Sequence, residues 1–189
     1  MSTFVPLPFF NENNLSSYLN LNLKVLQNDF IAFDTIKSVD LVNVYIPFVA
    51  LNNFFFEKFG SFNYKHSSSV LVESLLNKGE NSNSEQFYVH VANDFFQIVV
   101  IKNKKLIFYN AFDFKTKEDF IYYILFTAEQ LHLNPEKFQL TLLGDVEKES
   151  ELFNVAYNYV RHVNFYKYFD EDNNDSTVLN HANFILLNK

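Results

Sequence analysis

The sequence has 189 residues, a formal net charge of -7, no cysteine, and as many as 24 phenylalanines and 11 tyrosines. Without cysteine the chain can form neither a disulfide framework nor a thiolate metal site. The negative charge disfavours a nucleic-acid partner, because phosphates are bound mainly by lysine and arginine. No apolar run approaches the roughly 18 residues that a membrane-spanning helix needs. We therefore expect a globular, cytoplasmic protein with no membrane span.

The first part of the chain predicts short strands and helices in alternation. Leu15, Tyr18 and Leu19 indicate a short helix capped by Asn11 or Asn13, and Gly60 is a typical helix stop. The expected elements are an extended entry over 1–10, strands over 19–25, 30–33, 42–46 and 62–64, and helices over 48–59 and 69–77.

A linker is predicted at 78–84, where seven consecutive residues lack an apolar side chain. Such a stretch is typical of a boundary between two folded parts. We therefore expect two domains, a partial first lobe over 1–79, which carries an extra N-terminal subdomain, and a complete second lobe over 80–189.

The second part of the chain carries the clearest fold signature. Thr116 and Asp119 form a carboxylate variant of the capping box, which predicts where the long helix begins. The predicted order is three strands, helix, strand, helix, strand and a last element: 87–91, 97–101, 106–114, 116–132, 138–143, 150–163, 165–169 and 178–187. This βββαβαβα order is an α/β fold with a mixed sheet. The elements predicted before the linker match only the last four elements of this order.

The run FYVHVANDFFQIVVIKNKKLIFYNAFDFKTKEDFIYYILFTAEQLHLNPEKFQLTLLGD, preceded by VDLVNVYIP, resembles an uncharacterised bacterial family, a domain of unknown function with the actin-like ATPase fold. That fold is shared by actin, sugar kinases and chaperone ATPases, and the pilus-assembly and cell-division actin homologues of bacteria are the most similar. The resemblance covers about 4–187. It implies that the chain is an N-terminally depleted member that lacks the first meander.

The resemblance also implies where a nucleotide site would lie. Phosphates are held by a β-hairpin turn with an Asp and a Gly, which here is 92–96, so Asp94 matches the acid. Phe95 and Phe96 stand where small residues are expected, and we expect them to obstruct a phosphate. Gly144 and Asp145 resemble the paired glycines of the adenosine motif, with the second glycine replaced. Gly144 also fits a simple tight turn between a strand and the next segment.

Other chemistries have weaker support in the residues. Asp94, Glu118 or Glu129, and Asp145 occupy positions similar to the metal-binding carboxylates of ribonuclease-H-like nucleases. The acidic charge opposes that substrate, and an acid in a first helical turn is expected for dipole reasons. The five histidines show no metal-ligand spacing, and no nucleophile elbow accompanies the serines at 67–69.

The leading hypothesis is therefore a non-catalytic, actin-like-fold scaffold or adaptor that needs no cofactor. Its partner would be another protein or a second copy of the chain, without nucleic acid. The alternative is a divergent ATP-binding protein or ATPase that uses magnesium with Asp94, Gly144 and Asp145. We expect most rings of the dense aromatic runs at 54–56 and 122–123 to lie in the core, and any left outside to mark a protein interface.

Overall fold

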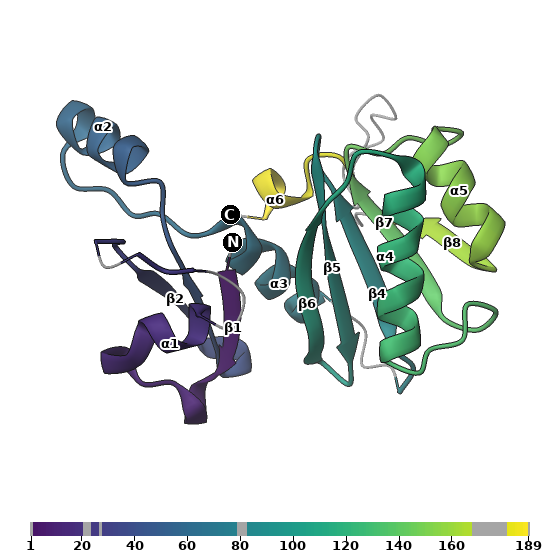
Figure 1. The fold of residues 1–189 in the computed structure, drawn as a ribbon, viewed down its shortest axis with the longest axis horizontal. Coiled ribbons are helices and arrows are strands. Elements are labelled where there is room, and N and C mark those ends of the chain that lie inside the picture. The colour runs from purple at the N-terminus through teal and green to yellow at the C-terminus, as the bar shows by residue number, and fades with distance from the viewer. Residues whose placement is uncertain (1, 21–23, 27, 79–82, 168–180, 189) are drawn as a thin grey trace. The chain divides into compact units, whose positions relative to one another are not determined.

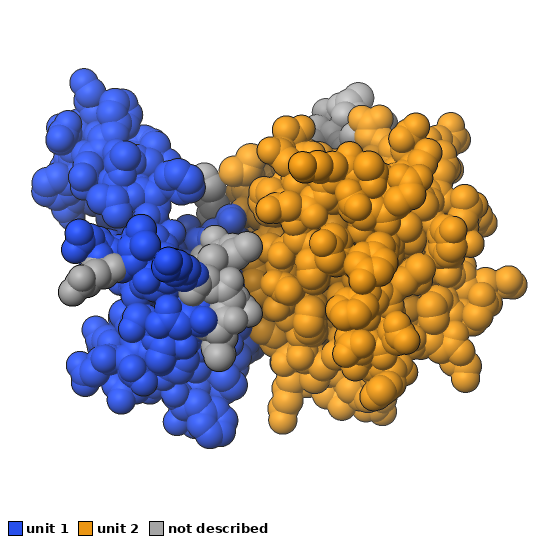
Figure 2. Space-filling model, in the orientation of Figure 1, with its two compact units in different colours: residues 1–77 blue, residues 78–189 orange. Residues whose placement is uncertain are grey.

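The computed structural model describes residues 2–20, 24–26, 28–78, 83–167 and 181–188. Predicted features that fall on 21–23, 79–82 or 168–180, among them most of the linker, lie outside the described residues. The chain divides into two compact units, residues 1–77 and 78–189, coloured blue and orange in Figure 2. Each unit is described by itself.

Unit 1 contains a three-stranded antiparallel sheet in the order β1–β3–β2. Val42 and Val44 point to one face of β3, where they form a small core with Val5 and Leu19. The bounds of its first elements are β1 (Ser2–Pro6), η1 (Leu7–Phe9), η2 (Glu12–Asn14), α1 (Leu15–Leu19), β2 (Ala32–Ile36), η3 (Lys37–Val39) and β3 (Leu41–Tyr45).

Two helices complete unit 1, and they differ in how much they bury. α3 (Ser67–Lys78) buries most of one face, including Leu71 and Leu75. α2 (Val49–Phe59) buries no residue, and Figure 1 shows it standing clear of the strands of unit 1. α2 ends at Gly60 as predicted, but the expectation that most of its rings lie in the core is wrong. Residues 62–64 form no strand.

Unit 2 contains a five-stranded mixed sheet in the order β6–β5–β4–β7–β8. β4, β5 and β6 form an antiparallel meander, whereas β4, β7 and β8 run parallel. Helical connections link the parallel strands, as such pairs require. The bounds are β4 (Gln86–Val91), β5 (Phe95–Lys102), β6 (Lys105–Asp113), α4 (Lys117–Gln130), β7 (Gln139–Gly144), α5 (Glu151–Tyr159), β8 (His162–Phe165) and α6 (Phe184–Leu187).

The predicted capping box forms at the start of α4. The Asp119 N–H donates to Thr116 Oγ1 at 3.1 Å, and the Thr116 N–H donates to Asp119 Oδ2 at 3.0 Å. Hydrogen bonds from the Lys115 N–H and from Thr116 lower the pKa of Asp119. α4 and α5 lie over the same face of the sheet (Figure 1), where Phe120 and Ile124 join the main core.

The end of α5 departs from the sequence prediction. The helix stops at Tyr159, and Val160 is already extended, with φ -119° and ψ 128°. β8 then begins at His162 and pairs in parallel with β7. Hydrogen bonding to the sheet edge therefore outweighs the helical periodicity that continues to residue 163. No helix in the described ranges is long and apolar enough to cross a membrane.

Candidate functional site

The carboxyl ends of β4 and β7 meet at one edge of the unit 2 sheet. Val91 and Gly144 are register partners, and the turn after β4 and Asp145 after β7 follow directly. Open α/β sheets place ligands at this edge. The structure thus brings the predicted residues Asp94, Gly144 and Asp145 to the same end of the sheet, with both carboxylates exposed.

Position 144 requires a glycine because the backbone of Val91 approaches it closely. Its φ is +81°, and a Cβ built on it would overlap the Val91 carbonyl oxygen and lie 3.0 Å from the Val91 nitrogen. The Gly144 N–H donates to the His181 carbonyl at 2.9 Å, and the Asp145 N–H donates to the Val91 carbonyl at 2.8 Å. The glycine therefore serves the contact between the ends of β7 and β4.

The turn between β4 and β5 is tighter than the sequence suggested. The Ala92 N–H donates to the Phe95 carbonyl at 2.9 Å, so Asn93 and Asp94 are the two turn residues and Phe95 already lies in β5. The Asp94 carbonyl accepts from the Phe114 N–H at 3.2 Å.

Phe96 does not obstruct this edge. Its side chain is fully buried in the main core, where its ring centroid lies 4.9 Å from that of Phe120. The expectation that Phe96 blocks an approaching phosphate is therefore wrong. Phe95 precedes it in the strand, so its partly exposed side chain points to the opposite face.

Two clefts flank Asp145. The first, of about 330 Å³, lies between Asp145 and the N-termini of α4 and α5, where Lys117 Nζ is 3.8 Å from Glu151 Oε2. The second, of about 360 Å³, extends toward Val146 and Ala182. Basic and acidic side chains thus share the first cleft, which gives it no strong preference for an anion.

His90 is a buried polar residue at this edge, near the end of β4. It is 8% exposed, and its Nδ1 has no hydrogen-bond partner in the described part of the chain. Burial lowers its pKa to about 4, against an opposing effect of the Asp145 carboxylate. A cavity of about 150 Å³ separates it from Leu186 of α6. The sequence signal for the burial of His90 is its position in β4, one residue before Val91.

The carboxylates proposed for a nuclease do not form a metal site. Asp94 and Asp145 lie at the carboxyl edge, whereas Glu129 lies near the far end of α4. Glu118 is in the first turn of α4 and exposed. Among the described residues, no three acidic or histidine side chains are arranged to hold a metal ion.

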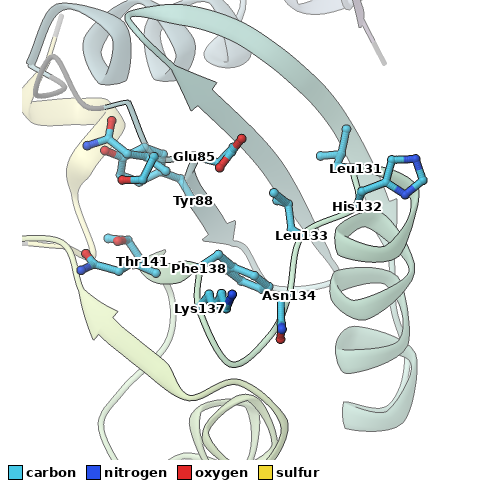
Figure 3. Close-up of a pocket in the computed structure, with 12 residues that line it drawn as sticks. Glu85, Tyr88, Leu131, His132, Leu133, Asn134, Lys137, Phe138 and Thr141 are labelled. Carbon is cyan, nitrogen blue, oxygen red and sulfur yellow. The ribbon is translucent and has the colours of Figure 1, made fainter.

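A further cavity lies at the other end of the same strands. It has a volume of about 720 Å³ and is lined by residues at the starts of β4 and β7 and by the turn after α4 (Figure 3). Glu85 at its rim is paired with Lys102 at 2.6 Å, which lowers the pKa of the Glu85 carboxyl. Figure 3 shows the His132 ring turned away from the cavity. None of the predicted site residues lines it.

Unit 1 holds a buried polar network that the sequence analysis missed. Asp34 Oδ1 accepts from the Tyr45 hydroxyl at 2.9 Å, and Oδ2 accepts from the His66 N–H at 2.8 Å and from the Ser69 hydroxyl. The Asn43 amide donates to Ser69 Oγ at 2.9 Å. Burial lowers the pKa of His66 to about 4 and raises that of Tyr45. The network joins α3 to the sheet of unit 1. Because Ser69 is fully buried, its hydroxyl does not form a nucleophile site.

Comparisons with known proteins agree with this architecture. A structure from Bacteroides thetaiotaomicron VPI-5482, described as a protein with actin-like ATPase fold and unknown function, matches with a TM-score of 0.79 at 24% identity, over 87% of this chain and 64% of that one. The PilM-PilN type IV pilus biogenesis complex matches with a TM-score of 0.50 at 10% identity, over 88% of this chain and 65% of that one.

Matches at identities this low show the fold and nothing more. The predicted actin-like fold is therefore confirmed. The chain spans less than two thirds of either matched structure. No curated protein matches it. A family model described as "Protein of unknown function (DUF3822)" matches residues 1–163. The chain therefore belongs to the DUF3822 family of proteins of unknown function, as the predicted resemblance to such a family implied.

Proposed function

We propose that this protein is a non-catalytic scaffold or adaptor with an actin-like fold, which acts by binding other protein surfaces. The observation that carries the proposal is the use of backbone amides at the carboxyl edge of unit 2. The N–H groups of Ala92, Gly144, Asp145 and Val146 all donate to carbonyls of this chain. Phosphate recognition at such an edge depends on free amides that point at the ligand.

The charges at this edge support the same conclusion. Asp94, Asp145 and Glu147 are exposed there, and an acidic cluster repels a polyphosphate unless a metal ion neutralises it. Lys117, which lines the cleft, lies beside Glu151. The residues present therefore do not fit a nucleotide with magnesium in the manner that the fold would suggest, and we derive no catalytic step from them.

A protein-binding role is supported by the apolar surface of unit 1. α2 exposes Val49 and Leu51 in its first half and four phenylalanines in its second half, Phe54, Phe55, Phe56 and Phe59. Exposed apolar surface of this extent is typical of a protein interface. The matched PilM structure is itself that of a complex with PilN. The alternative, a divergent nucleotide-binding protein, rests on the cleft beside Asp145 and the N-terminus of α4.

Calorimetric titration with Mg-ATP separates the two proposals. We expect no saturable heat of binding. We also expect phosphate to be released from ATP no faster than in buffer alone. Saturable binding that is lost in Asp145→Asn would refute the scaffold proposal, because the exposed carboxylate would then have a role in holding the metal. Phe95→Ser serves as the control, since Phe95 is exposed near the same end of the sheet but lines neither cleft beside Asp145.

A further inference from the structure

α2 exposes several large apolar side chains next to one another. Single exposed apolar side chains are common on proteins, but a group of this size is not. We define the α2 patch as Phe48, Leu51, Phe54, Phe55, Phe56 and Phe59. Phe48 is 83% exposed and Phe59 is 73% exposed, and no residue of α2 is buried. Monomeric proteins rarely leave so continuous an apolar surface in water. Removing this surface from water by contact with another apolar surface is therefore favourable.

Three rings of the patch are fixed by contacts with one another and with Phe62, which follows α2. The centroid of Phe55 lies 5.7 Å from that of Phe54, 6.1 Å from that of Phe59 and 5.9 Å from that of Phe62. Phe62 in turn lies 5.8 Å from Tyr64. Rings fixed in this way lose little conformational freedom when a partner binds, so the patch is preorganised for contact.

The area of the patch is close to what one half of a stable dimer needs. Phe54 and Phe56 are two residues apart in a helix and point to different sides, so one partner cannot cover both. Without Phe56, the five other side chains at the observed exposure, each with roughly 200 Å² of surface, present about 600 Å². A standard interface buries about 800 Å² on each partner. Two copies of this face would bury about 1,200 Å² in total, which is at the lower end of the range for a specific interface.

The charges favour a second copy over a charged partner. Glu57 and Lys58 are the only charged residues of α2, so the helix has no net charge, whereas the whole chain carries -7. A two-fold axis places the same patch on both sides, and a patch with one acid and one base is self-complementary across it. Two α2 helices from different copies can therefore approach each other without repulsion between like charges.

We propose that two copies of this chain associate through their α2 patches to form a symmetric dimer. The proposal rests on the proposed scaffold function and deepens it, because it names the surface and the partner. Raising the salt concentration should strengthen the dimer, since salt screens the repulsion between two chains of charge -7 while apolar contact persists.

Sedimentation velocity of the whole chain over about two decades of concentration, up to roughly 100 µM, tests the proposal. We expect the wild-type mass to approach twice the monomer value, and Phe55→Gln/Phe59→Gln to stay monomeric with an unchanged circular dichroism spectrum. Tyr122→Gln/Phe126→Gln is the matched control. This pair lies on α4 of unit 2, is 58% and 44% exposed, and is stacked at 5.9 Å. It should dimerise like the wild type.

Two results would overturn the α2 dimer. One is a wild-type monomer at every concentration and salt, and the other is a dimer that Phe55→Gln/Phe59→Gln leaves intact. Neither result changes the titration with Mg-ATP, so failure of the dimer and failure of the scaffold proposal are distinguishable. A patch that belongs to a different protein would appear as the first result, with the dye 8-anilinonaphthalene sulfonate binding wild type but not the double variant.

Discussion

Replacing Gly144 by alanine tests whether this glycine serves packing within the chain or an approaching ligand. The added Cβ would overlap the Val91 carbonyl oxygen, so the ends of β4 and β7 must move apart. The left-handed backbone costs about 1–2 kcal/mol for a residue with a side chain. Loss of the hydrogen bond from the Asp145 N–H to the Val91 carbonyl adds about 1–3 kcal/mol. We therefore expect Gly144→Ala to lower the free energy of unfolding of unit 2 by about 2–5 kcal/mol.

Gly60→Ala is the matched control, because Gly60 has φ +74° but a Cβ there would meet nothing within 4 Å. Only a backbone cost applies, on the order of 1–3 kcal/mol, because the φ of +74° and ψ of -149° at Gly60 lie in a region that residues with a side chain rarely adopt. The chain contains no tryptophan, so fluorescence cannot separate the two units. Hydrogen exchange of peptides from β7 and from α2, measured in increasing urea, reports each unit by itself. The explanation is refuted if Gly144→Ala costs no more than Gly60→Ala.

Three further predictions follow from other contacts. Thr116→Ala removes one half of the capping box and should destabilise α4 by about 1 kcal/mol in urea unfolding, whereas no loss would count against the cap. Asp34→Ala leaves its three buried donors without a partner and should cost unit 1 about 3 kcal/mol or more by hydrogen exchange; a loss below that of an exposed alanine substitution would contradict the network. The His90 imidazole should titrate at about 4 by NMR, and lower still in Asp145→Asn, because that carboxylate favours the charged ring. Since the unfolded chain takes up this proton near 6.5, unit 2 should lose stability as the pH falls from about 6.5 toward 4, and His90→Gln should reduce that loss. A normal histidine titration near 6.5 would contradict the buried environment.

The sequence was informative where local chemistry determines structure. Thr116 and Asp119 predicted the start of α4, and Gly60 predicted the end of α2, because caps and stops depend on residues a few positions apart. It was also informative about the fold, since the order of strands and helices after residue 85 is characteristic of an actin-like lobe.

The sequence was less informative where distant contacts decide the outcome. Phe96 was expected to face a ligand, but a turn of only two residues places it in the core, and no periodicity fixes turn length. The rings of α2 were expected inside because phenylalanine is usually buried, yet the described chain provides no cover for them. The partners of Asp34 come from β3 and the start of α3, far away in sequence, so the network could not be anticipated.

We propose that the carboxyl edge of unit 2 has the actin-like arrangement but does not bind phosphate. Titration of the isotope-labelled chain with Mg-ATP, followed by the NMR signals of the backbone amides of Asn93, Asp94 and Asp145, tests it most directly. We predict that these signals stay in place up to roughly millimolar nucleotide, because the neighbouring amides already donate within the chain. Saturable, magnesium-dependent shifts of these three amides would contradict the claim and favour a divergent nucleotide-binding protein.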